Sequence, residues 1–379
     1  MNNLRKLLDY GQSYWMDDLS RDLLRSGELP QLIRDQGLRG ITSNPAIFGK
    51  AIGGSSAYDE QIARAARAGR SAGQIYEELV VEDIRDACDA LRPVYDESNG
   101  ADGFVSLEVS PLLARDTTGS IDEGTHLAKL VDRPNLMIKI PGTAEGVPAI
   151  EELLHRGINV NVTLLFSVES YQAVAEAWLR AMERRLTEGL PVNNVASVAS
   201  FFVSRIDTLV DELLAHRIRP DGSSAVEPHP ATLQGKVAIA NAKVAYAQLR
   251  RLLAGDRWKK LEAAGARCQR LLWASTGTKN PAYSDVMYVE PLIGPNTVNT
   301  MPGPTAAAFA DHGKVRRTVT SGVPEARRVI RGLKQAGIDL KRVTWQLENE
   351  GIQKFIEPYG KLLSAIEEKR RRLADQQAA

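Results

Sequence analysis

The 379-residue sequence predicts an α/β fold, a TIM (β/α)8 barrel with an N-terminal helix and a C-terminal helical extension. Eight short apolar runs, most bounded by Gly, Pro, Asn or Asp, lie within roughly the first 290 residues. Stretches with apolar residues at helical spacing separate most of them, and this alternation is typical of a parallel sheet. Eight such units indicate a closed barrel. We predict a single domain over 1–379, with the barrel at about 12–335 and the extension at about 336–379.

The elements follow one another at the spacing expected of βα units. The predicted strands are 13–17, 38–44, 103–109, 135–141, 158–164, 195–202, 270–275 and 286–290. The predicted helices are 4–10, 20–27, 61–92, 120–130, 144–156 and 170–187, then a long helical region with a polar insertion at 221–224, and further helices from Pro302 onward. Pro358 is a candidate break in the last helix. The charged run 367–372 is interpreted as a solvated helix face.

The fourth predicted strand, Asn135–Pro141, carries a lysine in the middle of an apolar run. An unpaired ammonium group in apolar surroundings is costly, and such a group usually loses its proton instead. A neutral lysine amine attacks carbonyl groups to form a Schiff base, so Lys139 is the candidate nucleophile. The alternative is a lysine that extends to water or pairs with a carboxylate. The residues around Lys139 must decide between these interpretations.

Strand parity places polar residues near the C-terminal ends of the predicted strands, on a common face. That end of a TIM barrel is where its enzymes have their active sites. The residues predicted to converge on one pocket are Asp17, Asn44, Glu108, Lys139, Asn161, Thr163, Ser200 and Ser275, the last sharing a face with Trp273. A polar interior layer can also be hydrogen-bonded and inert. A purely structural barrel would instead carry Val, Ile and Leu there, so the pattern favours an active site.

The composition is that of a globular protein, with 43% hydrophobic and 25% charged residues and a formal net charge of +1. So small a net charge argues against a general nucleic-acid or membrane-surface role. The N-terminal segment leads into no long apolar run, so we expect neither a signal peptide nor a membrane span. The two cysteines, Cys88 and Cys268, indicate no disulfide framework. The expected location is the cytoplasm.

Motifs for metals and nucleotides are not found in the sequence. The five histidines have no metal-ligand spacing, and there is no Cys-x-x-Cys. Neither a Gly-x-Gly-x-x-Gly after a strand nor a P-loop occurs. We therefore expect no metal and no cofactor.

Seven segments spread over nearly the whole chain carry a more specific resemblance. They are residues 15–21 (WMDDLSR), 40–45 (GITSNP), 105–110 (VSLEVS), 137–141 (MIKIP), 157–166 (GINVNVTLLF), 200–207 (SFFVSRID) and 288–295 (YVEPLIGP). With these segments the sequence resembles the transaldolase family, in the long form found in many bacteria. The resemblance implies an enzyme of the non-oxidative pentose phosphate pathway with a class I mechanism, which proceeds through a Schiff base. A dihydroxyacetone unit would move from sedoheptulose 7-phosphate or fructose 6-phosphate to glyceraldehyde 3-phosphate or erythrose 4-phosphate.

The resemblance also implies catalytic roles for individual residues. Lys139 matches the Schiff-base lysine of the family. Asp17 matches the acid/base that takes the proton from the C4 hydroxyl of the donor. Glu108 and Thr163 match the pair that acts through a water molecule during imine formation and hydrolysis. Two carboxyl groups with different proton affinities suit these two tasks.

Further matches concern substrate binding. Asn44 and Asn161 match the residues that hold the dihydroxyacetone hydroxyls, and Ser200 lines the same pocket. Phe202 can help to exclude water from the enamine. Arg205, just beyond the sixth predicted strand, matches the phosphate arginine, and a guanidinium can bind phosphate bidentately. The alternative for Arg205 is an ordinary surface arginine.

The segment after the seventh predicted strand departs from the family pattern. The shorter transaldolases carry Ser-Phe-Arg there, whereas this chain has residues 275–281 (STGTKNP). Ser275 aligns with the motif, but no arginine follows. Lys279 is therefore the candidate replacement, as a point charge and not a fork.

Two alternative functions stay open on the sequence alone. A related Schiff-base aldolase would release free dihydroxyacetone and not transfer it. A catalytically silent sugar-phosphate-binding or scaffold protein would lack an acid/base, whereas Asp17, Glu108 and Lys139 are all present. The expected partners are sugar-phosphate substrates, with no nucleic acid and no membrane, and the chain is expected to be a monomer or a homodimer.

Overall fold

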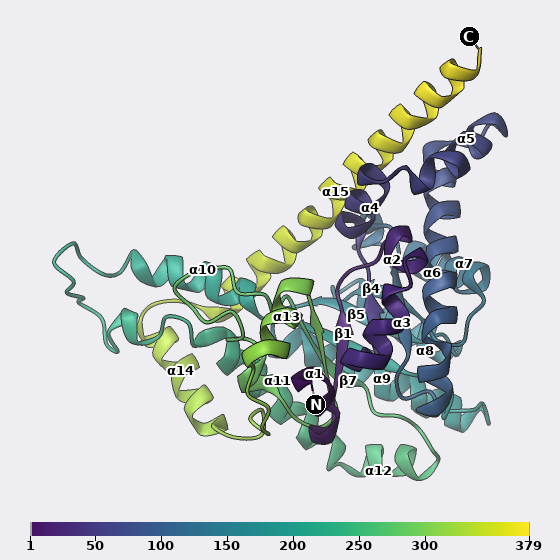
Figure 1. Ribbon diagram of the computed structural model, residues 1–379. Coiled ribbons are helices and arrows are strands. Elements are labelled where there is room, and N and C mark those ends of the chain that lie inside the picture. The colour runs from purple at the N-terminus through teal and green to yellow at the C-terminus, as the bar shows by residue number, and fades with distance from the viewer. Residues whose placement is uncertain (1, 379) are drawn as a thin grey trace.

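The computed structural model describes residues 2–378, so that Met1 and Ala379, the two ends of the predicted domain, lie outside the described residues. At its centre eight parallel strands form a closed barrel in the order β1 to β8 (Figure 1). The strands are β1 Gln12–Met16, β2 Gly40–Thr42, β3 Phe104–Glu108, β4 Leu136–Pro141, β5 Val160–Leu165, β6 Ser197–Phe202, β7 Arg270–Ala274 and β8 Thr297–Met301. The predicted TIM barrel is confirmed.

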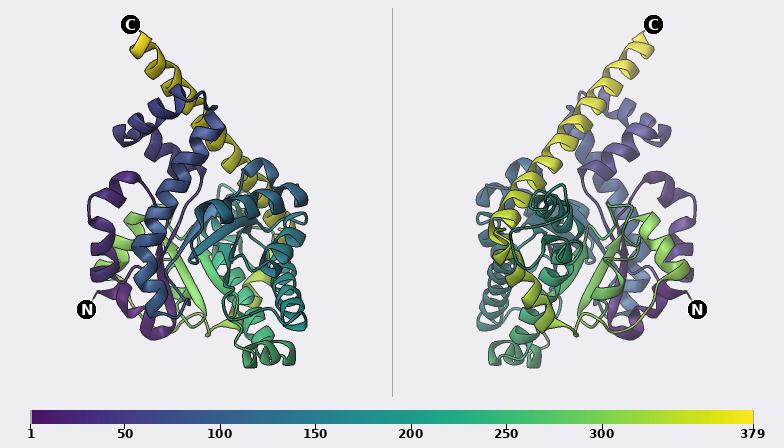
Figure 2. Two further views of the ribbon diagram at one scale, coloured as in Figure 1. Left: turned by 90° about the vertical axis from the view of Figure 1, so that its right-hand side faces the viewer. Right: turned by 90° about the vertical axis from the view of Figure 1, so that its left-hand side faces the viewer.

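Helices surround the barrel and extend beyond it (Figures 1 and 2). They are α1 Asn3–Lys6, α2 Arg21–Arg25, α3 Glu28–Gln31, α4 Pro45–Gly54, α5 Asp59–Arg67, α6 Ala72–Glu97, α7 Thr117–Val131, α8 Gly146–His155, α9 Val168–Thr187, α10 Ser204–Ala215, α11 Val237–Leu253, α12 Asp256–Ala263, α13 Gly303–His312, α14 Val323–Gln335 and α15 Leu340–Ala378. Short helices of other types lie between them, among them the π-helix η2 Leu32–Gln36 and the 3-10 helices η4 Pro111–Leu113 and η6 Glu290–Leu292. Among the helices of residues 2–378, none combines the length and the apolar character needed to cross a membrane.

The central strands are buried over their whole length. Every residue of β4 and every residue of β5 is buried. Parallel strands of this kind read as nearly continuous apolar runs, because helices cover their outer face and side chains fill the barrel. The few polar residues in these runs therefore stand out in the sequence, and they point inward.

The eighth strand does not lie where the sequence predicted it. Segment 286–290 forms turns leading into η6, and β8 is Thr297–Met301, which pairs with β1 and β7. The apolar side chains Val286, Tyr288 and Val289 are buried in this connection, so their pattern imitates a strand. The sequence of β8, Thr-Val-Asn-Thr-Met, is too polar to be recognised by its hydrophobicity.

The last helix, α15, is not broken at Pro358. It continues from Leu340 to Ala378 with Pro358 inside it. Phe355 and Leu362 on either side of the proline are buried. We infer that this packing outweighs the backbone hydrogen bond that a proline removes.

The charged run near the end of α15 is solvated only in part. Lys369 donates hydrogen bonds to the carbonyl oxygens of Ile52 and Ser55 and to the carboxylate of Asp59, at 2.9, 3.1 and 2.7 Å. The same helix contacts α4, α5, α6 and β5 along its length. It thus crosses the barrel mouth, and its C-terminal end points away from the barrel (Figures 1 and 2).

Candidate active site

A cavity of about 180 Å³ lies at the C-terminal end of the barrel. Its lining residues are Asp17, Thr42, Asn44, Lys139, Thr163, Ser200, Phe202, Arg205, Ala274, Ser275, Gly277, Lys279, Thr300, Pro302 and Phe355. Most of the predicted site residues therefore line one cavity. Glu108 and Asn161 are not in its wall but lie directly behind it, in contact with residues that are.

Lys139 is buried at the wall of this cavity and is only 5% exposed. Its Nζ donates a hydrogen bond of 3.0 Å to the carbonyl oxygen of Ser43. The same nitrogen lies 3.9 Å from Oε2 of Glu108 and 5.7 Å from the ring centroid of Phe355. The side chain does not extend to bulk water, and its contact with a carboxylate is long. The amine is therefore placed for reaction with a molecule in the cavity.

Glu108 faces Lys139 from the neighbouring strand, because β3 and β4 pair with these two residues in register. Among the described residues, neither of its carboxyl oxygens has a hydrogen-bond partner. Burial raises the pKa of Glu108 to about 7, with Lys139 opposing and Asp17 adding to the rise. A carboxyl group with a pKa near neutrality can both give and take a proton.

Asp17 follows β1 and lies in the cavity wall, where two hydrogen-bonded hydroxyl groups orient it. Its Oδ1 accepts a hydrogen bond of 2.7 Å from Oγ1 of Thr42, which in turn lies 2.7 Å from Oγ1 of Thr300. Burial raises the pKa of Asp17, while Lys139 and the hydrogen bond from Thr42 oppose the rise. The site therefore holds two carboxyl groups, both with raised pKa, near one amine.

The amide and hydroxyl groups of the site are fixed to different degrees. Asn161 donates from Nδ2 to Oγ of Ser106 at 2.9 Å and accepts from Oγ of Ser200 at 2.6 Å. Asn44 caps helix α4, since its Oδ1 accepts from two backbone N–H groups of the first turn. By contrast, the buried Oγ1 of Thr163 has no partner among the described residues. A substrate or a water molecule in the cavity can supply that partner.

The cavity wall contains two basic side chains, Arg205 and Lys279. The guanidinium of Arg205 stacks over the ring of Phe202, 5.2 Å from its centroid. Its Nη1 is buried and has no hydrogen-bond partner among the described residues. Burial lowers the pKa of Arg205, and Asp17 and Glu350 oppose this. Lys279 lines the same cavity. Arg205 is therefore not simply a surface arginine, and the pair suits an anionic group.

Ser275 lines the cavity as predicted, but strand parity is not the reason. Trp273 pairs with Phe201 in register and packs against its ring on the outer side of the barrel, while Ala274 lines the cavity. Strand β7 ends at Ala274, and Ser275 has a left-handed φ of 54°. The turn, and not strand parity, brings Ser275 into the cavity wall.

Among the cavity-wall residues that the sequence did not identify are Thr42, Thr300 and Phe355. Thr42 shares its face with Asn44 in the predicted second strand, so parity could have revealed it. Thr300 was missed because its strand was missed. Phe355 comes from α15, and its helical spacing indicated a buried position without indicating which surface it covers.

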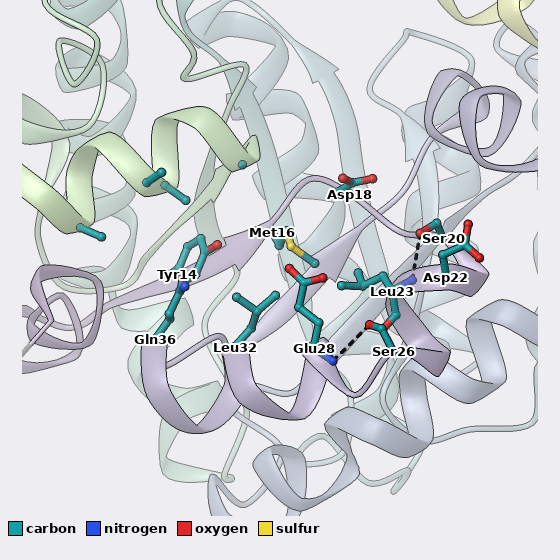
Figure 3. Close-up of a pocket in the computed structure, with 14 residues that line it drawn as sticks. Tyr14, Met16, Asp18, Ser20, Asp22, Leu23, Ser26, Glu28, Leu32 and Gln36 are labelled. Atoms are coloured by element: carbon teal, nitrogen blue, oxygen red, sulfur yellow. Dashed lines mark hydrogen bonds between the residues drawn. The ribbon is translucent and has the colours of Figure 1, made fainter. Parts of the chain in front are cut away.

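A wider hollow of about 480 Å³ lies on the outer side of β1 (Figure 3). Tyr14 and Met16 point into it from the strand, η2 and α13 form its sides, and its charged lining residues are the acids Asp18, Asp22 and Glu28. None of the described residues that line it is a lysine, an arginine or a histidine. It offers no nucleophile matched to a general base. The smaller cavity at the barrel mouth is therefore the candidate active site.

Comparison with known proteins agrees with this geometry. The family model described as Transaldolase/Fructose-6-phosphate aldolase matches residues 14–366. A protein named transaldolase from Trichodesmium erythraeum is 50% identical over 374 residues, which are 98% of each chain. A transaldolase 2 from a Nostoc species is 50% identical over 97% of this chain and 98% of its own. A transaldolase 1 from Streptomyces avermitilis is 47% identical over 97% and 95%. The chain belongs to the transaldolase/fructose-6-phosphate aldolase family.

Proposed function

We propose that the chain is a class I transaldolase of the non-oxidative pentose phosphate pathway. It transfers a dihydroxyacetone unit from sedoheptulose 7-phosphate or fructose 6-phosphate to glyceraldehyde 3-phosphate or erythrose 4-phosphate through a Schiff base on Lys139. The observation that carries this proposal is the buried amine of Lys139, 3.9 Å from Glu108, in a cavity whose wall also contains Asp17. A silent binding protein has no need of an amine and two carboxyl groups with raised pKa at one point.

Schiff-base formation uses the side of the cavity near Glu108. The amine of Lys139 attacks the C2 carbonyl of the ketose, and water leaves from the carbinolamine to give an iminium ion. Glu108 and Thr163 act through a water molecule to move the protons of these steps. This role is supported by the pKa of Glu108 near neutrality and by the unpartnered oxygens of both side chains.

The next step, carbon–carbon cleavage, is assigned to Asp17. Asp17 takes the proton of the C4 hydroxyl, the C3–C4 bond breaks, and its electron pair moves toward the iminium nitrogen to give an enamine. The aldehyde product leaves, and the enamine then attacks the acceptor aldehyde by the same steps in reverse. The raised pKa of Asp17 favours proton uptake, and Thr42 holds the carboxylate in place.

Substrate binding is assigned to the remaining wall residues. Asn44, Asn161 and Ser200 hold the dihydroxyacetone hydroxyls, and Ser275 lines the same pocket. Arg205 and Lys279 bind the phosphate, which supplies a partner to the unpaired Nη1 of Arg205. No cofactor is needed for this chemistry, because the iminium nitrogen serves as the electron sink.

Product analysis with and without an acceptor aldehyde tests the proposal. With fructose 6-phosphate and erythrose 4-phosphate we expect sedoheptulose 7-phosphate and glyceraldehyde 3-phosphate. Without an acceptor we expect little free dihydroxyacetone. Steady release of dihydroxyacetone at the same rate in both cases would instead identify the rival function, an aldolase.

We also propose a single domain, a cytoplasmic location, a monomer or homodimer, and no nucleic-acid or membrane partner. The contacts of α15 with α4, α5 and α6 favour one domain, since the C-terminal extension packs on elements of the barrel. Limited proteolysis tests this, because a separate extension would be released as a stable fragment. Light scattering on the purified protein gives the oligomeric state.

A further inference from the structure

We propose that Phe355 of helix α15 is a specificity-determining residue that shields the Schiff-base nitrogen from water and so favours transfer over hydrolysis. This inference rests on the proposed function. Phe355 lines the cavity together with Lys139, and its ring centroid lies 5.7 Å from Nζ of Lys139. The ring is 7% exposed although it belongs to a helix that lies outside the barrel. It covers the amine from the direction of the barrel mouth.

The placement of Phe355 follows from the face that α15 presents to the barrel. Residues three or four apart share a helix face, and Gly351, Phe355, Tyr359, Leu362 and Ile366 continue one stripe. Gly351, one turn before Phe355, lies so close to the barrel that a side chain there would have to displace a neighbour. A Cβ there would lie 2.9 Å from Cδ2 of Leu164, at the end of β5. The helix backbone therefore approaches the end of β5 closely, and the next turn brings Phe355 over the amine.

Contacts further along α15 hold it in this position. The ring of Tyr359 packs edge-on against Tyr76 of α6, with centroids 5.4 Å apart. Lys369 is bound to the end of α4 and to Asp59 of α5 by the three hydrogen bonds described above. Because Asn44 caps the N-terminus of α4, helix α15 also packs on the element that positions this pocket residue. The helix is thus held on both sides of Phe355, by the close approach of Gly351 to Leu164 before it and by these contacts after it.

The chemistry explains why such a shield matters. After cleavage, the enamine on Lys139 has two fates. It can attack an acceptor aldehyde, which is transfer. It can instead be protonated at carbon to the iminium ion, and water then adds to C2 and the amine of Lys139 leaves, releasing dihydroxyacetone. Excluding water from a reactive intermediate suppresses the second fate. An apolar ring over the nitrogen removes one direction of approach for water.

The test compares Phe355→Ala and Phe355→Leu with the wild type. The enzyme is incubated with fructose 6-phosphate alone, and the lifetime of the dihydroxyacetone adduct is followed by borohydride trapping at intervals. The ratio of dihydroxyacetone release to transfer is measured with erythrose 4-phosphate. Trp345→Ala is the control, because Trp345 lies on the same helix and is 66% exposed. Circular dichroism checks that each variant is folded, and Phe355→Leu keeps the site apolar if the alanine variant unfolds.

We expect the ratio of release to transfer to rise about tenfold in Phe355→Ala, and less in Phe355→Leu, with a matching fall in adduct lifetime. Trp345→Ala should leave both unchanged. Equal losses of release and transfer in folded Phe355 variants, with an unchanged adduct lifetime, would overturn the inference and indicate a merely structural role. If the wild type itself formed no adduct, the proposed function would fail instead.

Discussion

Both ends of the barrel bury charged side chains, but the buried carboxyl groups at the two ends differ in their hydrogen bonding. At the N-terminal end, the carboxylate of Asp102 accepts hydrogen bonds from Oγ of Ser13 at 2.5 Å, Nε1 of Trp15 at 2.9 Å and Nη2 of Arg270 at 3.1 Å. At the C-terminal end, Glu108 is equally buried and has no hydrogen-bond partner among the described residues. Both carboxylates lie near a cation, Arg270 and Lys139 respectively.

The difference indicates what each end is for. A buried charge with a full set of partners holds neighbouring elements together, and here it joins β1 and the start of β7 to the segment that leads into β3. A buried carboxyl group without hydrogen-bond partners lowers stability and is tolerated where a substrate or water molecule supplies them. Substitutions at the two ends should therefore separate stability from activity, and the following predictions test that separation from the largest expected effect to the smallest.

Replacing the amine at the C-terminal end should abolish activity and spare the fold. Lys139→Met keeps bulk and removes the nucleophile, so we expect transfer to fall by on the order of a thousandfold or more. The free energy of unfolding should change little, because Glu108, which loses Lys139 as its ion-pair partner, can keep its proton at its raised pKa. Steady-state rates and urea unfolding measure the two effects. Lys259→Met, at an exposed lysine, is the control and should change neither.

Replacing the partnered carboxylate at the N-terminal end should do the reverse. Asp102→Asn leaves Arg270 without its carboxylate, and we expect the free energy of unfolding to fall by about 3 kcal/mol. The kcat of the folded fraction should stay near that of the wild type. A large loss of kcat with unchanged urea unfolding would mean that this end takes part in the chemistry, contrary to the comparison.

Glu108 should lower stability in a pH-dependent way. Its pKa is raised to about 7 in the folded protein, above the value near 4.5 of an ordinary glutamate. The folded state thus binds the proton more tightly than the unfolded state, and the stability present at low pH is lost as the pH rises toward 7. Glu108→Gln carries no charge at any pH. Relative to the wild type, its free energy of unfolding should therefore increase by about 2–3 kcal/mol between pH 5 and pH 8.

Urea unfolding at several pH values measures this difference, and the transfer rate of Glu108→Gln should fall at every pH. A stability difference that is flat from pH 5 to pH 8 would contradict the raised pKa. Asp102→Asn is the matched comparison from the other end of the barrel.

The smallest effect is expected at Lys279, one of the two residues proposed to bind the substrate phosphate. Lys279→Ala removes one of two cations, and we expect KM for fructose 6-phosphate to rise about tenfold with little change in kcat, since one charge-assisted contact is lost. Unphosphorylated fructose, if turned over, should be unaffected. An unchanged KM would leave Arg205 as the phosphate ligand and remove Lys279 from the proposal.

The barrel could be predicted because its buried strands carry their own signal. Residues 136–141 and 160–165 are apolar except for a few inward-facing polar residues, so one pattern gives both the strand and the candidate site. Lys139, Asn161 and Thr163 were found in this way, and the structure brings them to one end of the barrel. Ser275 was also predicted, but for the wrong reason: Trp273, with which parity grouped it, faces outward, and a left-handed turn sets the direction of Ser275.

Long-range packing limited the rest of the prediction. Val286, Tyr288 and Val289 are buried in the connection between β7 and β8, and their strand-like pattern concealed the more polar β8 that follows. Nothing local to residues 351–366 shows that α15 crosses the barrel mouth, although their spacing shows which face is buried. The position of Phe355 beside Lys139 depends on contacts with α4, α5 and α6, which only the folded chain reveals.

The most direct measurement is borohydride reduction in the presence of fructose 6-phosphate, followed by mass mapping of the peptides. The account predicts one dihydroxyacetone-derived adduct, on the peptide that contains Lys139, and no adduct in Lys139→Met. An adduct on a different lysine, or an active wild-type enzyme that borohydride and fructose 6-phosphate fail to modify, would contradict it.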